Sequence, residues 1–267
     1  MSRFVPLSKS AHRESGLVAT GHQFALEQAV VPVVAEEVPH VLPTMAMAFV
    51  KSDRDDGLEL AALQSLQAGV NVYVHTNGRW IGGYRPAWYR AHPFRVLVDA
   101  SSRQEVVCVD EQSPAFEQRC SEKGERLFDS HGELAERGRN AVAFLKKLGE
   151  ATAVTSALVK QLQDAGVIVA WDLTARNPNS EAGFEVKGLY HIDERALRSL
   201  DPEVLSALNA SGALSVAYAQ LLSEHRLKGL SRLYELRHQA SGQSRSVDDV
   251  DLEDLFGEDD DDLSFNF

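Results

Sequence analysis

The pattern of apolar residues changes near Gly132, and this change constrains the fold more than any other feature of the chain. Before Gly132, short apolar runs are separated by turn-forming residues, as is typical of strands. After it, leucine and valine recur at helical spacing over about thirty residues. Strands first and helices later, without regular alternation, favour an α+β fold over a doubly wound parallel sheet.

Residues 20–115 are the β-rich part of this prediction. The predicted strands lie at residues 45–50, 58–66, 70–75, 80–84, 94–98 and 105–110. Between two of them, Asn77-Gly78 supplies residues that tolerate positive φ in a tight hairpin turn. Pro32 and Pro39 bound a predicted short helix. A curled antiparallel sheet or an open barrel is the simplest arrangement for these strands.

Residues 133–237 are predicted to be mainly helical. The first helix is long, although Gly138 and Gly149 allow a break within it. A polar loop is expected at residues 176–183. Asp193 and Asp201 are suited to cap two later helices, because an aspartate side chain accepts hydrogen bonds from the first free N–H groups.

The net charge of −12 is concentrated at the end of the chain. Residues 248–267 contain ten acidic side chains and no lysine or arginine, so the rest of the chain carries about −2. A body this close to neutral has no basic excess for phosphates, which argues against nucleic-acid binding. We expect residues 1–240 to form a single domain and residues 241–267 an acidic tail.

Apolar side chains are interleaved with the acidic ones in this tail. Leu255 and Phe256 fit one edge of a short helix, whereas Leu263, Phe265 and Phe267 alternate as in a strand. Such a segment can order as it binds in an apolar groove with a basic rim. Three alternatives stay open: a solvated tail, docking on its own body, and docking on a separate partner.

Aromatic and basic side chains are densest between residues 78 and 94, where two of the three tryptophans and two of the six tyrosines occur. Aromatic faces beside guanidinium groups can hold a planar or anionic ligand. The same rings can instead fill a core junction. Adding a histidine that opens the β-rich part, the candidate residues for ligand or partner binding are His22, Trp80, Tyr84, Arg85, Tyr89, Arg90 and His92.

The common signatures of catalysis are missing from the sequence. It contains no Gly-x-Gly-x-x-Gly, no phosphate loop and no Gly-x-Ser-x-Gly elbow. The histidines lack metal-binding spacing, and two cysteines, Cys108 and Cys120, do not make a zinc site. We therefore expect no metal and no cofactor, and we assign no catalytic residue.

Hydropathy argues against membrane insertion and export. No apolar run approaches the ~20 residues that span a bilayer, and the first residues lack the apolar core of a secretory signal. We therefore expect a cytoplasmic protein with reduced cysteines.

Several motifs together resemble the bacterial SapC family over about residues 20–237. They are Val31-Pro32-Val33-Val34-Ala35-Glu36-Glu37, Gly78-Arg79-Trp80 with Tyr84-Arg85-Pro86, Arg90-Ala91-His92-Pro93-Phe94, Asp110-Glu111-Gln112-Ser113-Pro114, and Leu189-Tyr190-His191-Ile192-Asp193-Glu194. The resemblance carries no established reaction. It implies genes encoded beside TonB-dependent receptors, halogenase-like proteins and cupin-like proteins.

The function expected from this resemblance is that of an intracellular accessory or binding protein. It would act with a partner enzyme, halogenase-like or cupin-like, in the uptake or modification of a peptide or other small nutrient. One alternative is an enzyme with a pocket around residues 80–92. The other is a surface-layer component, which would require export.

Overall fold

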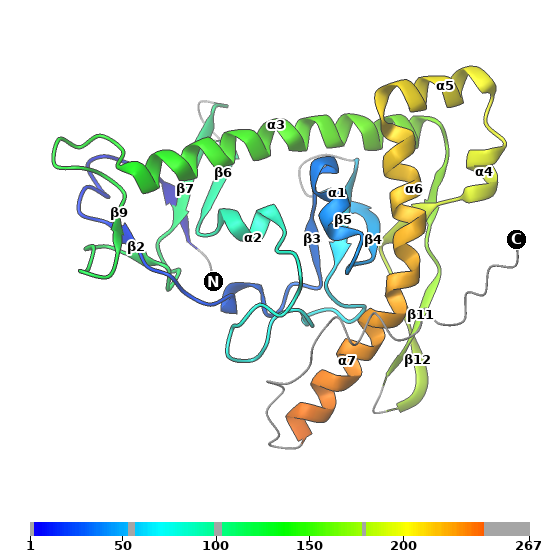
Figure 1. The fold of residues 1–267 in the computed structure, drawn as a ribbon, viewed down its shortest axis with the longest axis horizontal. Helices are drawn as coiled ribbons and strands as arrows, with labels where there is room; N and C mark the ends of the chain where they lie inside the picture. The colour runs from blue at the N-terminus through cyan, green and yellow to red at the C-terminus, as the bar shows by residue number, and fades with distance from the viewer. Residues whose placement is uncertain (1–2, 53–56, 99–102, 178–179, 243–267) are drawn as a thin grey trace, which may run out of the picture.

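The computed structural model describes residues 3–52, 57–98, 103–177 and 180–242 (Figure 1). It confirms the α+β class, because strands dominate the N-terminal half, helices gather toward the C-terminus, and the sheets are open. The predicted division into one domain and a tail stays a prediction.

A five-stranded antiparallel sheet forms the centre of the molecule. Its middle strand is β4 (Met47–Lys51), in which Met47 and Phe49 are completely buried. In sheet order, the strands are β10 (Ile168–Ala170), β13 (Leu189–Ile192), β4, β5 (Leu58–Leu63) and β3 (Val30–Pro32). Since β13 pairs with β4, this sheet combines strands from both halves of the chain.

The other described strands belong to three smaller sheets. One has the order β1 (Phe4–Pro6), β7 (Glu105–Asp110), β6 (Phe94–Val98), and a second has the order β8 (Phe116–Glu117), β2 (Gly16–Leu17), β9 (Glu125–Arg126). The third is a hairpin of β11 (Leu173–Asn177) and β12 (Ser180–Val186). The strands of the β-rich part are therefore divided among separate sheets.

Helix α3 (Glu136–Asp164) connects two hydrophobic cores and runs across the molecule without a break (Figure 1). Near its start, Leu145 packs into one core with strands β6 and β7, whereas Leu162 packs into the core of the central sheet. The helix continues through Gly138. A Cβ at this position would lie 2.6 Å from the carbonyl oxygen of Leu127. The glycine therefore permits close packing.

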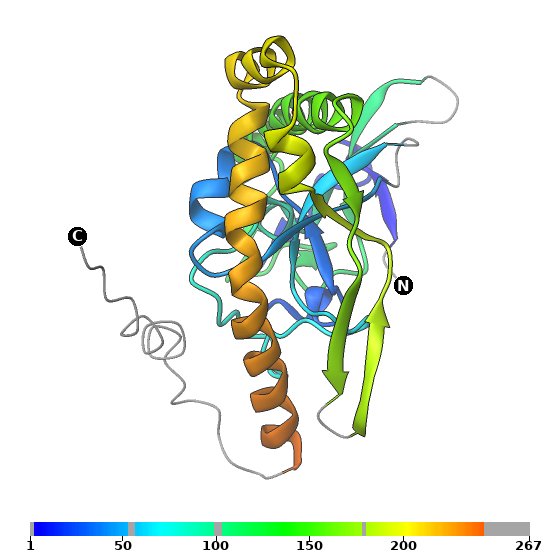
Figure 2. The same ribbon diagram turned by 90° about the vertical axis from the view of Figure 1, so that its right-hand side faces the viewer.

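Four helices follow: α4 (Glu194–Arg198), α5 (Pro202–Ser211), α6 (Ala213–Ser223) and α7 (Leu227–Gly242). Of these, α6 packs on strands β4 and β13 of the central sheet. Both predicted caps are confirmed, since Asp193 accepts from two backbone N–H groups and Asp201 from one. Buried Gln220 of α6 donates to the Met47 carbonyl and accepts from Ile192 N–H. Helices α6 and α7 continue one another beside the β11–β12 hairpin (Figure 2).

The strands predicted at residues 70–75 and 80–84 are wrong, although the turn between them is correct. Gly78 has a φ of 85°, but the two flanks share only one bridge, between Val74 and Trp80. The guanidinium of Arg237 donates to the carbonyls of Asn71 and Val74 instead. This side chain satisfies backbone groups that a strand ladder would otherwise pair.

Two further local predictions need correction. Pro39 does not end a helix but lies in the first turn of α1 (Val38–Val41), after the short 3-10 helix η2 (Ala35–Glu37), where its missing N–H costs nothing. The polar loop predicted at residues 176–183 is also wrong where the structure describes it, because residues 176–177 belong to β11 and residues 180–183 to β12.

Among the residues that the structure describes, no helix is both long and apolar enough to cross a membrane. The N-terminal part also contains the 3-10 helix η1 (Gln23–Ala25), and η3 (Glu224–Arg226) joins α6 to α7.

Candidate functional site

The residues from 78 to 94 form a loop and the short helix α2 (Ala87–Ala91), which lies beneath α3 (Figure 1). Their side chains divide into two groups that we name by their centres. The Glu37 cluster contains Val34, Glu37, Tyr84, Ala87 and Arg90. The aromatic cluster contains His22, Phe24, Tyr73, Trp80, Tyr89 and His92.

Four rings of the aromatic cluster form a closed circuit. The Trp80 ring centroid lies 5.6 Å from that of Tyr89 and 5.9 Å from that of His22. Phe24 completes the circuit at 5.9 Å from Tyr89 and 6.0 Å from His22. On its other side, Phe24 stacks on His92 with 3.7 Å between centroids. Residues 22–24 and 73–92 are therefore joined through their rings.

Two ring nitrogens in this cluster are buried without a hydrogen bond. Arg85 Nη1 lies 2.8 Å from His22 Nε2, and because a guanidinium can only donate, Nε2 accepts and the proton is on Nδ1. His22 Nδ1 and Trp80 Nε1 form no hydrogen bond of normal geometry with any described residue. Trp80 Nε1 is therefore an N–H donor without an acceptor, and His22 Nδ1 meets the Gly78 carbonyl only outside normal hydrogen-bond geometry.

Burial and the charge of Arg85 lower the pKa of His22, although the nearby Gly78 carbonyl opposes this shift. The ring is consequently neutral at pH 7 and keeps a single N–H group. Gly82 packs against the indole edge of Trp80, where a Cβ would lie 3.0 Å from Nε1. The backbone at Gly82 thus lies close to Trp80 Nε1, one of the two unbonded donors.

His92 is also held neutral. Burial lowers its pKa to about 4, with a further lowering by Arg95, while Asp110 acts in the opposite direction. Its Nε2 lies 2.8 Å from Ser113 Oγ. His92 therefore has a polar partner, unlike the Nδ1 group of His22.

A cavity of about 330 Å³ opens beside these rings. Phe24, Tyr89, His92 and Arg95 line it. Burial raises the pKa of Tyr89, whose hydroxyl accepts from the Asn71 amide at 3.3 Å. The lining thus combines neutral rings with the guanidinium group of Arg95 and the carboxylate of Glu59.

The Glu37 cluster, by contrast, is fully bonded. Glu37 Oε1 accepts from Ala87 N at 2.6 Å and from Tyr84 Oη at 2.8 Å, and Oε2 accepts from Val34 N at 3.2 Å. Arg90 donates to Tyr84 Oη and lies 3.8 Å from Glu37 Oε1. Burial and this carboxylate raise the pKa of Tyr84 to about 12. We interpret the cluster as structural, since it fastens α2 to the start of α1.

The structure thus brings five of the seven candidate residues into or against the aromatic cluster: His22, Trp80, Arg85, Tyr89 and His92. Tyr84 and Arg90 belong instead to the Glu37 cluster. The tail candidates Leu255, Phe256, Leu263, Phe265 and Phe267 lie outside the described residues.

The candidates from the sequence do not include Phe24, Tyr73 and Glu37, which belong to these clusters, or Ser113, the partner of His92. Phe24 stands two positions after His22, so its proximity was a usable signal. Glu37 follows exposed Glu36, and local sequence gives no reason why only the second carboxylate is buried.

Within the described ranges, no three histidine, cysteine, aspartate or glutamate side chains gather as metal ligands would. Cys108 and Cys120 are both free thiols.

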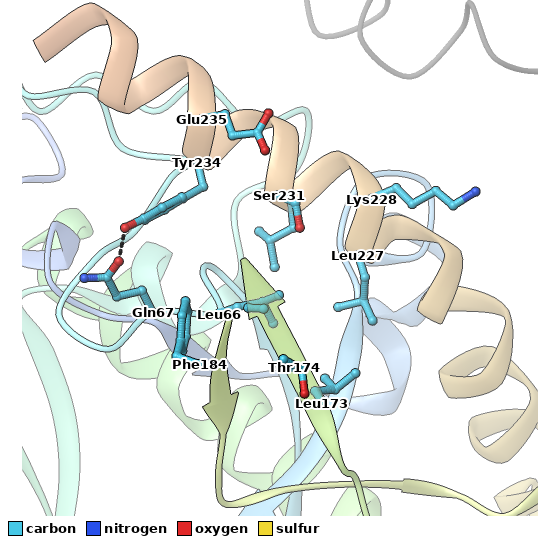
Figure 3. Close-up of a pocket in the computed structure, with 12 residues that line it drawn as sticks. Leu66, Gln67, Leu173, Thr174, Phe184, Leu227, Lys228, Ser231, Tyr234 and Glu235 are labelled. Carbon is cyan, nitrogen blue, oxygen red and sulfur yellow. Dashed lines mark hydrogen bonds between the residues drawn. The ribbon is translucent and has the colours of Figure 1, made fainter. Parts of the chain in front are cut away.

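A second hollow lies between α7 and the β11–β12 hairpin (Figure 3). Its volume is about 280 Å³, and Leu173, Phe184, Leu227 and Tyr234 are among its lining residues. We call it the hairpin groove. The sequence does not predict this groove, because the polar residues at 176–183 are typical of a loop rather than of a strand pair.

Comparison with known proteins gives one finding. The model of the SapC family matches residues 7–230. No curated protein and no solved structure matches the chain.

Proposed function

Because this chain belongs to the SapC family, we propose that it is a cytoplasmic accessory protein that binds a peptide or other small nutrient. It presents this ligand to a partner enzyme, halogenase-like or cupin-like, in a process linked to TonB-dependent uptake. The partner follows from the family resemblance, and the ligand class from the aromatic cluster.

The observation that carries the proposal is the pair of unbonded donors, His22 Nδ1 and Trp80 Nε1. A buried polar group without a partner costs roughly 1–3 kcal/mol, so native proteins rarely retain one without a use. Neither residue lines the adjoining cavity, so a ligand has to reach past Phe24 or Tyr89 for its acceptor oxygens to satisfy both groups. Peptides carry such oxygens in their carbonyl and carboxylate groups, and Arg85 adds a positive charge beside His22.

The neutral rings of the cluster support binding by stacking. His92 and Tyr89 are uncharged at pH 7, and an aromatic or amide plane can pack against them without displacing a hydrated ion. The adjoining cavity of about 330 Å³ is within the size range of roughly 300–1,000 Å³ that is usual for small-molecule sites.

Affinity purification from the native cell tests this proposal. Proteins and small molecules that co-purify with the wild-type chain are identified by mass spectrometry and compared with those of a Trp80→Phe, Arg85→Gln variant. We expect a small molecule with a carboxylate or amide to be recovered at least about tenfold less with this variant. An Arg119→Gln variant is the control, because Arg119 is exposed and pairs with Glu14. Equal recovery from all three proteins would contradict the proposal.

A second candidate function is catalysis, and one contact favours it. Ser113 Oγ lies 2.8 Å from His92 Nε2, the arrangement in which a histidine activates a serine for acyl transfer. However, Ser113 is only 5% exposed and its Oγ accepts from Ala115 N. A fluorophosphonate probe separates the two functions, because labelling that is lost in Ser113→Ala would establish a reactive serine.

A further inference from the structure

We propose that residues 263–267 of the tail bind in the hairpin groove of the same molecule, as a third strand beside the β11–β12 hairpin. This inference is independent of the ligand proposed for the aromatic cluster, since it concerns a different surface and a different segment.

The hairpin groove is apolar and small. Leu66, Leu173, Phe184, Leu227, Leu230 and Tyr234 contribute the apolar part of its lining (Figure 3). Its volume of about 280 Å³ is slightly below the usual range for ligand pockets, roughly 300–1,000 Å³. A groove of this size accommodates a few apolar side chains of a peptide segment.

The hairpin that forms one wall has open edges. Strands β11 and β12 pair only with each other within the described part of the chain. Leu173 lies opposite Val186, and Ala175 lies opposite Phe184, so these four side chains share one face of the hairpin. An isolated two-stranded sheet is marginally stable, and an open edge can accept a further strand.

The end of the tail has the residue pattern that such a strand requires. Leu263, Phe265 and Phe267 alternate with Ser264 and Asn266. Alternate side chains of a strand point to the same side. All three apolar side chains can therefore face α7, while the two polar ones face away. This is the recognition mode in which backbone pairing is combined with pockets for every second side chain.

The tail begins at the right place and is long enough. Helix α7 ends at Gly242, and the groove lies along the same helix from Leu227 to Tyr234. Returning from Gly242 to Leu227 takes about 22 Å of helix axis, whereas the 21 residues to Leu263 span up to ~70 Å when extended. A tethered segment also has a high effective concentration at its own groove.

Charge favours the same contact. Residues 226–237 contain four basic side chains and one acidic one, Glu235. Lys228, at the groove, and Arg232 are both exposed on α7. Five consecutive acidic residues, 258–262, directly precede Leu263. This acidic run and the basic helix attract each other when the last residues are docked.

Hydrogen–deuterium exchange on the full-length chain tests the inference. The Phe265→Ser, Phe267→Ser variant removes two of the apolar side chains, and we expect the amides of residues 173–186 to exchange at least about tenfold faster than in the wild type. The matched control is Ser264→Ala, Asn266→Ala, whose side chains face away from the groove. We expect this control to exchange as the wild type does.

The outcomes are distinguishable. Identical hairpin exchange in the wild type and the phenylalanine variant would overturn the inference, as would equal effects of both double variants. Protection that is lost on tenfold dilution would show docking into a second copy, which also contradicts binding within one molecule. Native co-purification of a ligand with the aromatic cluster is unaffected by these variants, so the two proposals can fail separately.

Discussion

The aromatic cluster and the hairpin groove differ in how fully the surrounding residues enclose them and hold them in place. In the aromatic cluster, rings from two segments are already in contact, and the rigid Glu37 cluster supports the helix that carries Tyr89. The hairpin groove is bounded by one helix, residues 66–67 and a hairpin whose edges are open within the described part of the chain. The first region therefore suits a ligand selected by hydrogen bonds, and the second suits a segment that completes the fold.

Replacing Glu37 gives the largest expected effect on this comparison. Glu37→Ala leaves the N–H groups of Val34 and Ala87 and the Tyr84 hydroxyl without their acceptor. We expect the free energy of unfolding to fall by about 3 kcal/mol. Urea denaturation measures it. The neighbouring Glu36→Ala is the control and should change stability by at most about 0.5 kcal/mol, because Glu36 is exposed. Equal losses of stability in the two variants would show that the hydrogen bonds of the Glu37 cluster do not stabilise the fold.

The second-largest effect is expected from acidification, which should lower the stability that His92 contributes to the aromatic cluster. The folded-state pKa of His92, about 4, lies below its unfolded value of 6.5, so the unfolded chain binds this proton first as the pH falls. The neutral ring therefore contributes its full stabilisation above pH 6.5. This contribution to the free energy of unfolding decreases as the pH falls from 6.5 to about 4. We expect a loss of about 2 kcal/mol from this residue, discounted for its partial exposure.

Urea denaturation at a series of pH values measures this dependence. His92→Gln should flatten it between pH 6.5 and 4, whereas His131→Gln, at an exposed position, should leave it unchanged. A His92→Gln profile parallel to that of the wild type would contradict the assignment.

A matched pair of phenylalanine substitutions compares the two regions directly. Phe24→Ala removes a ring that contacts three others, and we expect a loss of about 2 kcal/mol. Phe184→Ala removes a ring from the open groove, and we expect about 1 kcal/mol. Thermal unfolding of both variants measures the difference. A larger loss of stability in Phe184→Ala than in Phe24→Ala would show that the hairpin groove, and not the aromatic cluster, is the more tightly packed region.

Salt should have the smallest effect, and only in one region. Raising NaCl from about 0.05 to 0.5 M shortens the screening length severalfold, which weakens attraction between the acidic tail and α7. We expect exchange protection of the hairpin to fall by a factor of about two or three. Protection of the buried segment around Tyr73 should stay constant. Equal salt effects in both places would mean that the tail has no particular role at the groove.

Local elements of the fold were predictable because their signals are local. Strands β6 and β7 occupy the predicted residues 94–98 and 105–110. The Asp193 and Asp201 caps depend only on the next few residues. The pairing of β4 with β13 was not predictable, because it joins residues about 140 positions apart and no local pattern encodes it.

The site was predictable as a set of residue types but not as a geometry. The sequence points to Trp80, Arg85 and His92 because aromatic and basic residues are dense there. Which nitrogen lacks a partner depends on long-range contacts, such as the Arg85 approach to His22. Likewise, the burial of Glu37 results from packing against residues 84–90, which follow it by about fifty positions.

The most direct test of the account is the indole N–H resonance of Trp80 in the protein purified from its native cell. Spectra are recorded before the bound small molecule is removed by dialysis and after, with Trp80→Phe assigning the signal. If Trp80 Nε1 donates to a ligand oxygen, its resonance shifts on removal, while that of Trp171, stacked on His191 in the other part of the fold, does not. A Trp80 resonance that is identical before and after removal would contradict the account.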